Sequence, residues 1–452
     1  MRKSDEEIKK ELLEKAKKPA QDALKLHPYY GGKIETVPKV PVRSVKDFAI
    51  WYTPGVAAPC REIEKNVDLV YEHTSKWNTI AVVSDGTRVL GLGDIGPHAA
   101  MPVMEGKALI FKYLGGVDAV PICLDTKDPE KFIETVKLLE PSFGGINLED
   151  IAKPKCFYIL DRLRKEMNIP VWHDDQQGTA AVTVAGLINA AKIVGKDFKK
   201  LKIIMLGTGA AGLATLRLLI AAGVDPGNII LVDRKGIVYK DREDLKEKFP
   251  YNYELVIKTN REDRRGGQDE AFEDMDVFIG YSKPGPGVVS QDNIRSMAKD
   301  PIVFACANPI PEIWPWEAKE AGAKIVATGR SDFENQVNNS LGFPGIFRGT
   351  LDVKARTITD EMCLAATYEL AKVAEDKGLR EDYIIPTMDD WEVFPREAAA
   401  VAMKAIEQGV AKATLSYEKS YRRAEEVIKR AREMTKKHME EGYIRPMPEG
   451  VE

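Results

Sequence analysis

The sequence has few cysteines, no excess of either charge and no long apolar run. Its 452 residues include five cysteines, an odd number without a C-x-x-C pair, so we expect reduced thiols and no disulfide framework. Lysine and arginine total 66 against 70 aspartate and glutamate, a net charge of −4, which argues against nucleic acid or an anionic membrane as a partner. Neither an apolar signal region nor a spanning segment of roughly 18 residues is present, and we expect a cytoplasmic protein.

Hydrophobic patterning predicts an α/β protein with two doubly wound parallel-sheet domains and a helical C-terminal segment. In the first half, helix-like segments alternate with short β-rich runs at 79–85, 119–125, 144–150 and 169–175. In the second half, such runs lie at 201–207, 228–233, 276–280, 301–307 and 323–328. Strand and helix in repeated alternation are typical of parallel sheets with crossover helices.

The two ends of the chain depart from this alternation. An amphipathic helix is predicted at 4–18, and a Pro- and Gly-punctuated stretch at 28–59 favours loops and turns. Beyond about residue 355 the pattern becomes helical. We predict a substrate- and metal-binding domain at 1–195, a dinucleotide-binding Rossmann domain at 196–354, and a helical segment at 355–452 that packs back on the first domain.

A glycine-rich turn follows the first strand of the second half. In LKIIMLGTGAAGLATL the glycines form a G-x-G-x-x-G pattern between an apolar strand and a helix. Glycine there permits a tight turn and close approach of a pyrophosphate, while the helix N-terminus offers free N–H groups. The predicted cofactor-binding residues of the turn are Gly207, Gly209, Ala210, Ala211 and Gly212.

The next predicted strand ends at Asp233, 21 residues beyond Gly212. An acid near this spacing accepts hydrogen bonds from both ribose hydroxyls and repels a 2′-phosphate, which favours NAD. Arg234 and Lys235 follow directly, and they would suit the phosphate of NADP instead. A structural turn without nucleotide is the alternative interpretation.

Acidic side chains gather at two predicted strand ends. Glu149 and Asp150 end one strand, and Asp174 and Asp175 end the next. Ligands of open α/β sheets collect at the carboxyl ends of strands, and unpaired carboxylates there would raise one another's pKa. A hard cation, Mg²⁺ or Mn²⁺, resolves the repulsion. Helix capping explains Asp175 alone but not the whole set, and His173 is expected to support the ligands without binding the metal.

Five further polar residues are candidates that the pattern alone leaves undecided. Lys107 opens an apolar helix, where burial would favour a neutral amine that serves as a general base. Tyr52 lies in a predicted loop and carries a proton-donating phenol. Arg88 suits a carboxylate clamp, and Asn308 and Asn339 follow strands of the second half with amide donors. Each has an ordinary structural alternative: a surface lysine, a packed aromatic, an exposed arginine, or turn asparagines.

Together these segments resemble the malic enzyme family, especially its smaller microbial type. The matching stretches occur in the family's order between roughly 50 and 350: YTPGVAAPC, VSDGTRVLGLGDIG, PVMEGKA, GGINLEDI, HDDQQGTAAVTVAGL, LGTGAAG, ANPIPE and NNSLGFPG. The resemblance implies oxidative decarboxylation of L-malate to pyruvate and carbon dioxide with NAD or NADP, dependent on Mg²⁺ or Mn²⁺, and also decarboxylation of oxaloacetate. It implies a homodimer or higher homo-oligomer, with small molecules as the other partners.

The resemblance also implies residue roles. Tyr52 would be the general acid, Lys107 the general base, and Asp174 a support for the site near Lys107. The implied metal ligands are Glu149, Asp150 and Asp175. The implied contacts with malate come from Arg88, Asn308 and Asn339, and Asn308 would also bind the cofactor. Arg88 lies at a position that varies among smaller family members. Tyr52 would serve the site of a neighbouring subunit.

Two rival functions make different predictions. A metal-free 2-hydroxy acid dehydrogenase would stop at the keto acid and would use a His–carboxylate pair as base, for which the sequence offers no convincing histidine. A non-catalytic nucleotide sensor would bind NAD without metal-dependent turnover. The acid cluster and Lys107 favour the decarboxylating enzyme over both.

Overall fold

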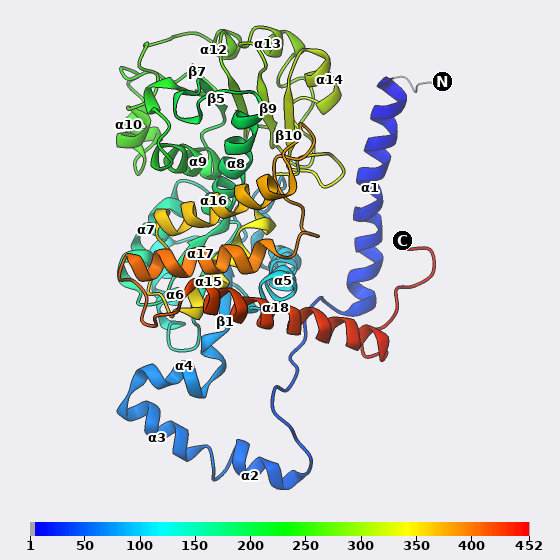
Figure 1. Cartoon of the computed structure of the whole chain (residues 1–452), viewed down its shortest axis with the longest axis vertical. Helices are drawn as coiled ribbons and strands as arrows, with labels where there is room; N and C mark the ends of the chain where they lie inside the picture. Colours follow the sequence, from blue (N-terminus) through cyan, green and yellow to red (C-terminus); the bar gives the residue numbers. More distant parts are fainter. Residues whose placement is uncertain (1–4, 452) are drawn as a thin grey trace.

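A computed structural model describes residues 5–451 and contains two parallel sheets, one in each lobe (Figure 1). The first sheet has the order β2-β1-β3-β4 and every pair is parallel. Its strands are β1 (Thr79–Ser84), β2 (Asp118–Cys123), β3 (Gly145–Leu148) and β4 (Val171–His173). The predicted α/β class with two parallel sheets is confirmed, and all four strands of the first half lie within the predicted runs, apart from the first residue of β2.

Helices cover both faces of the first sheet. They are α5 (Gly96–Gly115), α6 (Pro129–Leu138), α7 (Lys155–Glu166) and α8 (Asp174–Ile193). Most of α8 is buried, because it packs against α9 of the second lobe and α16 of the C-terminal segment as well as the sheet. The helix begins one residue after β4, with His173 at the N-cap. Asp174 and Asp175 therefore lie in its first turn, which corrects their predicted place at a strand end and the predicted N-cap at Asp175.

The second sheet has six strands in the order β10-β9-β8-β5-β6-β7. They are β5 (Ile203–Leu206), β6 (Ile229–Asp233), β7 (Gly236–Ile237), β8 (Val277–Gly280), β9 (Ile302–Ala305) and β10 (Ile325–Thr328). Only β7, a two-residue antiparallel edge, was not predicted, and it is too short to show a period. The chain order reverses between β5 and β8, where doubly wound sheets bind their ligands.

The helices of the second lobe are short apart from the first. They are α9 (Ala210–Ala221), α10 (Leu245–Lys248), α11 (Tyr253–Val256), α12 (Gln268–Phe272), α13 (Gln291–Arg295) and α14 (Pro315–Glu320).

The C-terminal helices pack on the first lobe, as Figure 1 shows. They are α15 (Phe343–Asp352), α16 (Asp360–Lys377), α17 (Val393–Glu407) and α18 (Tyr417–Glu440). The rings of Phe343 and Phe347 in α15 lie 4.5 and 5.2 Å from that of Phe111 in α5. This apolar contact ties the C-terminal helices to the helix that carries Lys107.

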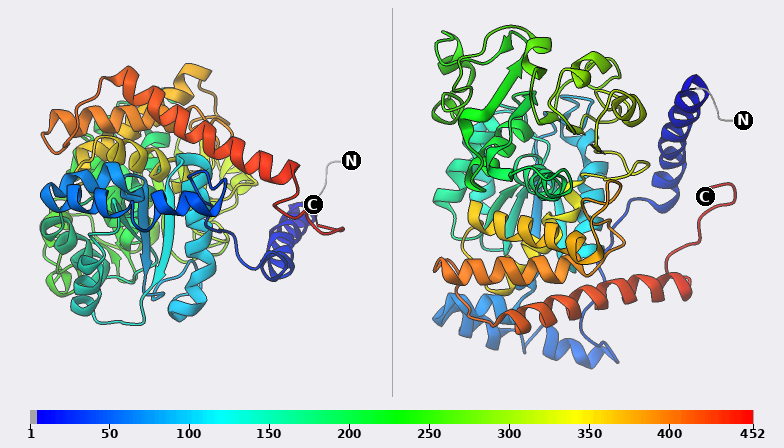
Figure 2. Two further views of the ribbon diagram at one scale, coloured as in Figure 1. Left: turned by 90° about the horizontal axis from the view of Figure 1, so that it is seen from below. Right: turned by 45° about the horizontal axis from the view of Figure 1, so that its top comes forward.

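The N-terminal segment extends away from both lobes (Figures 1 and 2). Helix α1 (Asp5–Tyr30) is longer than predicted; residue 4 lies outside the described residues. The stretch expected to be loop contains α2 (Phe48–Trp51) and the start of α3 (Ala57–Lys65), and α4 (Val70–His73) leads into β1. We call residues 33–73 the arm. All five cysteines are free, as expected, and no described helix is long and apolar enough to cross a membrane.

Candidate active site

Lys107 is buried among carboxylates at the carboxyl ends of the first sheet. Its Nζ lies 2.5 Å from Oδ2 of Asp174 and 3.0 Å from Oε1 of Glu149. The ammonium also lies over the ring of Phe343, 4.3 Å from its centroid. The side chain is 8 % exposed, so the predicted burial of Lys107 is confirmed, but Lys107 lies in the middle of α5 and not at its start as predicted.

The charge state of Lys107 differs from the prediction. Burial is the largest single influence and would lower the pKa of Lys107, as the sequence suggested, but attraction to Asp174 and Glu149 outweighs it. The pKa of Lys107 is therefore raised above its usual value. From the sequence, only the effect of burial on the pKa of Lys107 could be foreseen. The acids that α8 and β3 bring close to the amine become its neighbours only in the folded chain.

The carboxyl groups around Lys107 are buried close to one another, and both burial and mutual repulsion disfavour their ionised forms. Burial, with added repulsion from the neighbouring acids, raises the pKa of Glu149 well above its usual range, and Lys107 offsets only part of this. Burial and repulsion from Asp175 raise the pKa of Asp150 to about 7. One lysine thus faces four carboxylates, and these cannot all ionise at low cost without further positive charge.

The carboxylate oxygens are suitable ligands for a divalent cation, although they are not arranged around a common point. Asp150 Oδ2 is buried without a hydrogen-bond partner, and Asp175 Oδ2 accepts a hydrogen bond from the Asp150 N–H at 2.8 Å. Among the described residues, no group of three His, Cys, Asp or Glu side chains stands where it could hold a metal ion, because Glu149 and Asp174 are turned toward Lys107. The all-oxygen set matches Mg²⁺ or Mn²⁺ in chemistry.

Two supporting residues escaped the sequence argument. Asn147 Nδ2 donates to Glu149 Oε2 at 2.9 Å, and Trp172 Nε1 donates to Asp174 Oδ1 at 3.1 Å. Each lies in a strand, two residues before the acid that it supports, and that acid comes just after the strand ends. That spacing was a usable signal, since a buried polar group in an apolar strand requires a partner.

His173 is fully buried beside this cluster. Neither ring nitrogen has a hydrogen-bond partner, and Nδ1 lies 3.7 Å from Asp175 Oδ2. Burial lowers the pKa of His173, so the imidazole is neutral. It lies behind Asp175, where it was expected to act as a support.

The three residues predicted to contact the substrate, Arg88, Asn308 and Asn339, lie in separate segments of the chain. The Arg88 backbone N–H donates to the Asp150 carbonyl at 3.0 Å, and its side chain is bound to the Leu90 carbonyl. The Asn308 carbonyl oxygen lies 3.4 Å from a Cβ built on Gly91, which brings this second-lobe residue next to the Arg88 loop. Asn339 begins a short 3-10 helix, Asn339–Leu341, and lies close to the acid cluster.

Gly178 explains how Asn339 approaches Asp174. A Cβ built on Gly178 would lie 2.0 Å from Asp174 Oδ1 and 3.2 Å from Asn339 Cβ. Only glycine leaves room in this turn of α8 for both side chains. The glycine of DDQQG is therefore part of the site, and sequence reasoning did not single it out.

The glycine turn of the second lobe has the geometry of a nucleotide-binding loop. Gly207 has φ +111°, and a Cβ there would lie 2.5 Å from the Tyr281 carbonyl oxygen. A Cβ on Gly212 would lie 2.2 Å from the Gly207 carbonyl oxygen, whereas a Cβ on Gly209 would meet nothing within 4 Å. Gly207 and Gly212 thus close the turn, and Gly209 leaves open space before α9.

Asp233 occupies the end of β6, as predicted, but its carboxylate is engaged. Oδ2 accepts hydrogen bonds from Arg242 Nη2 at 2.7 Å and from Lys248, and Oδ1 accepts one from the Lys235 N–H at 2.8 Å. The side chain is 3 % exposed. Arg242 and Lys248 lie in the loop and short helix after β7, which no sequence pattern linked to Asp233.

Tyr52 does not reach this site within the chain. It caps α2 on the arm, its exposed fraction is 70 %, and the arm enters the first sheet at the amino end of β1. The acids lie at the opposite, carboxyl end of the same sheet. The structure therefore brings together every predicted site residue of the first lobe except Tyr52.

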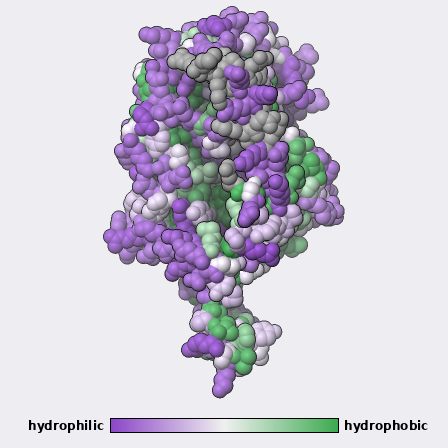
Figure 3. All heavy atoms as spheres, turned by 90° about the vertical axis from the view of Figure 1, so that its right-hand side faces the viewer, coloured by the Kyte–Doolittle hydropathy of each residue, from purple (hydrophilic) through white to green (hydrophobic). Residues whose placement is uncertain are grey.

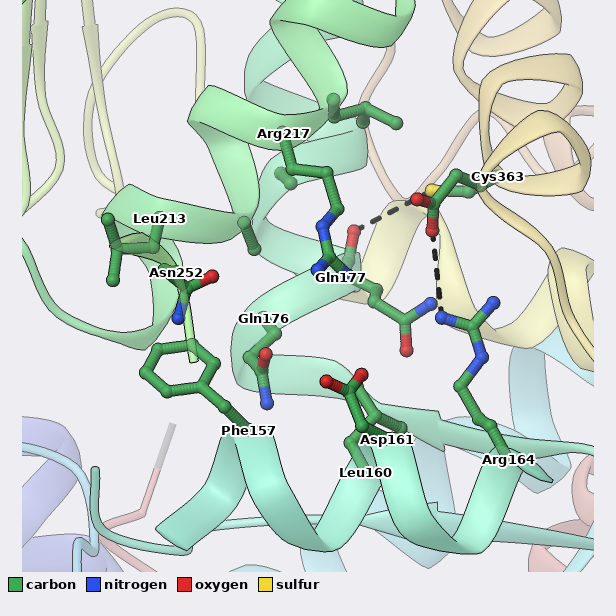
Figure 4. Close-up of a pocket in the computed structure, with 14 residues that line it drawn as sticks. Phe157, Leu160, Asp161, Arg164, Gln176, Gln177, Leu213, Arg217, Asn252 and Cys363 are labelled. Carbon is green, nitrogen blue, oxygen red and sulfur yellow. Dashed lines mark hydrogen bonds and ion pairs between the residues drawn. The ribbon is translucent and has the colours of Figure 1, made fainter. Parts of the chain in front are cut away.

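A separate small cavity lies between α7, α8, α9 and α16 (Figure 4). Gln177 and Arg217 project into it, and Gln177 Nε2 is buried without a partner. None of the predicted site residues lines this cavity. It is therefore distinct from the acid cluster and the glycine turn.

Comparison with known proteins agrees with this arrangement. Residues 31–164 match the model of the malic enzyme N-terminal domain, and residues 176–408 match that of the malic enzyme NAD binding domain. The chain belongs to the malic enzyme family. It is an oxidoreductase with a Rossmann domain, as the resemblance implied.

Relatives within the malic enzyme family cover most of the chain. The bifunctional malic/malolactic enzyme of Bacillus subtilis is 51 % identical over 92 % of this chain and 98 % of its own length. The NAD-dependent malic enzyme of Geobacillus stearothermophilus is 52 % identical over 85 % of this chain and 79 % of its own. The NADP-dependent malic enzyme of Halomonas elongata is 44 % identical over 84 % of this chain and 92 % of its own length.

The fold is shared with a solved malic enzyme. The crystal structure of Entamoeba histolytica malic enzyme superposes with a TM-score of 0.92 at 48 % identity, covering 96 % of this chain and 91 % of that one. At this identity, the arrangement of both lobes and the C-terminal helices is common to the two proteins.

Proposed function

We propose that this chain oxidises L-malate with NAD or NADP and decarboxylates the resulting oxaloacetate to pyruvate, with Mg²⁺ or Mn²⁺ as a required cation. The observation that carries the proposal is Lys107, buried between Asp174 and Glu149 at the carboxyl ends of the first sheet. Asn308 of the second lobe adjoins the loop that follows β1, so residues of both lobes lie near the proposed site.

The proposed cation ligands are Glu149, Asp150 and Asp175. The unpartnered Oδ2 of Asp150 and the surplus of carboxylates over cations support them. When bound, a divalent cation would polarise the substrate's hydroxyl or keto oxygen and stabilise the negative charge that develops there as carbon dioxide leaves. Arg88, Asn308 and Asn339 would bind the carboxylates of malate.

Lys107 would remove the hydroxyl proton as hydride leaves for the nicotinamide. The contacts with Asp174 and Glu149 raise its pKa, so weakening either contact makes the free amine more accessible. Asp174 then has a second role, since it stabilises the ammonium that forms when Lys107 accepts the substrate proton. Tyr52 would protonate the enolate carbon, and Lys107 would return a proton to the phenolate.

Tyr52 would reach the site from a second copy of the chain. Val45, Phe48, Ile50 and Trp51 flank it and are 81, 51, 57 and 44 % exposed. Figure 3 shows hydrophobic side chains on this projecting arm. A contiguous exposed apolar patch marks an interaction surface, and a two-fold dimer would give each subunit's arm to its partner.

The activity is tested by measuring initial rates on L-malate with each dinucleotide, and by measuring pyruvate, carbon dioxide and oxaloacetate with and without chelator. Metal-dependent formation of pyruvate and carbon dioxide supports the proposal. Stoichiometric oxaloacetate that is insensitive to chelator would identify a metal-free dehydrogenase. Dinucleotide binding without any turnover would identify a nucleotide sensor.

The shared site is tested by mixing two inactive variants, Tyr52→Phe and Lys107→Ala, under conditions that exchange subunits. If Tyr52 acts across the dimer, each mixed dimer has one complete site, and activity recovers to about a quarter of the wild-type value. If Tyr52 acts within its own chain, no mixed dimer contains a complete site. Absence of recovery in a sample shown to contain mixed dimers would therefore reject the shared site.

A further inference from the structure

The end of β6, where a dinucleotide's adenosine ribose is expected, carries a surplus of positive charge. Two carboxylates lie there, Asp233 and Asp244. The cations around them come from both lobes: Lys153, Arg234, Lys235, Arg242 and Lys248. Five cations against two carboxylates make this region attractive to an additional anion.

The carboxylate of Asp233 is poorly placed to select NAD. An acid that recognises the ribose needs free oxygen lone pairs that face the hydroxyls, whereas Asp233 accepts hydrogen bonds from Arg242, Lys248 and the Lys235 N–H. Arg242 is fixed in turn by two bonds to Asp244, at 2.9 and 3.0 Å. The charge of Asp233 is thus balanced, and it presents little repulsion to a phosphate.

Cationic groups remain available beside it. Arg234 is exposed, and no hydrogen bond or ion pair joins its side chain to another described residue. Lys248 is 28 % exposed in the same place. Lys153 of the first lobe donates to the Thr208 carbonyl of the glycine turn at 3.1 Å, and burial together with repulsion from Lys248 and Arg234 lowers the pKa of Lys153.

We propose that the second lobe selects a dinucleotide with a 2′-phosphate, held by Arg234 and Lys248, and that Asp233 anchors Lys248 instead of binding the ribose. A phosphate monoester carries about −1.5 to −2 charges and three acceptor oxygens, which suits a guanidinium and an ammonium with unused donors. The inference rests on the proposed function, because it assumes that the glycine turn binds a nicotinamide dinucleotide.

The test measures binding of two fragments by calorimetry, without malate or metal. The fragments are 2′,5′-ADP and 5′-AMP, which differ by the 2′-phosphate alone. We expect 2′,5′-ADP to bind at least about tenfold more tightly, and this advantage to fall with rising salt. Equal or tighter binding of 5′-AMP, or failure of both to bind, would overturn the inference.

Variants assign the preference to residues. Arg234→Gln, an exposed change that leaves the fold intact, should lose at least about threefold in affinity for 2′,5′-ADP and none for 5′-AMP. Adding Lys248→Gln should bring the two fragments within about twofold of each other. The control is Lys246→Gln, on the same short helix and without contact to Asp233. A preference that survives the double variant would reject these two residues.

The outcome is separable from that of the proposed function. Preferential binding of 2′,5′-ADP by a protein that does not oxidise malate would leave this inference standing and reject the proposed activity. Malate oxidation with NAD at an efficiency equal to or above that with NADP would support the proposed activity and reject this inference.

Discussion

The two lobes place opposite charges on equivalent positions. At the carboxyl ends of the first sheet, Lys107 faces four carboxylates, and the pKa of Asp150 rises to about 7 through burial and repulsion. At the end of β6 in the second sheet, Asp233 and Asp244 lie among five cations, and hydrogen bonds from Arg242 and Lys248 hold the pKa of Asp233 below its usual value against the effect of burial.

If both proposed sites are right, the parallel sheet determines where ligands bind, and the local charge determines which ligands. Both clusters occur because strands in one direction bring their carboxyl ends to one edge. An acidic edge suits a cation and a hydroxy acid's proton transfer, and a basic edge suits a phosphorylated nucleotide. Substitutions in one lobe at a time test this difference.

Replacing the central cation of the acidic edge should have the largest effect. Lys107→Ala is expected to lower kcat/KM for malate by at least about 10³-fold, because the general base is lost. Dinucleotide affinity should be unchanged, as measured by calorimetry. The matched control is Lys112→Ala, later in the same helix, where the lysine pairs with Asp118 near the surface; it should retain activity. Turnover above about a tenth of wild type would reject Lys107 as the base.

Alanine substitutions at two glycines of the nucleotide turn should differ in their effects on stability and on dinucleotide affinity. Gly212→Ala puts a methyl group 2.2 Å from a carbonyl oxygen, so it should lower the free energy of unfolding by about 1–3 kcal/mol and abolish dinucleotide binding. Gly209→Ala meets nothing in the protein, so stability should be unchanged while affinity falls by about tenfold or more, since the methyl group enters the pyrophosphate's space.

Thermal unfolding and calorimetry on both variants decide this point. Equal destabilisation by Gly209→Ala and Gly212→Ala would contradict the separate roles. Unchanged binding by Gly209→Ala would show that the cofactor does not approach this turn.

Removing one acid should change the metal requirement of the first lobe alone. Asp150→Asn is expected to raise the Mn²⁺ concentration for half-maximal activity by about tenfold or more, because a carboxylate ligand becomes a neutral amide. Affinity for 2′,5′-ADP should not change. Asp161→Asn in α7, away from the strand ends, is the control. An unaltered Mn²⁺ requirement in Asp150→Asn would remove Asp150 from the ligand set.

The sequence was sufficient for nine of the ten described strands and for the edge of the first sheet on which Lys107 and the acids lie. Apolar strands such as β1 and β5 were recognisable because both faces are buried, and the glycine spacing around Gly209 identified the nucleotide turn. The predicted shift in the pKa of Lys107 had the wrong direction. The pKa depends on Asp174 and Glu149, which are distant in sequence and come close to Lys107 only after folding. The contacts of Arg242 and Lys248 with Asp233 could not be predicted either, because they too form only after folding.

The arm was the other element that local pattern could not place. Its prolines and glycines favoured loop, whereas α2 and α3 form between them. Tyr52 is 70 % exposed, and in the proposed dimer its surroundings would come from a second copy. Periodicity within one sequence carries no information on such a surface.

The smallest expected effect comes from the hydrogen bond that Trp172 donates to Asp174. Trp172→Phe keeps an aromatic ring in the buried site but removes the 3.1 Å bond from Nε1 to Oδ1. A carboxylate that loses one donor is a stronger partner for Lys107, which raises the pKa of the lysine further and makes the free amine scarcer. We therefore expect kcat for malate to fall by about three- to tenfold and its pH dependence to move to higher pH, with stability lowered by about 1–2 kcal/mol. A purely structural role for Trp172 would lower stability without moving the pH profile, so an unmoved profile contradicts the coupling between the two side chains.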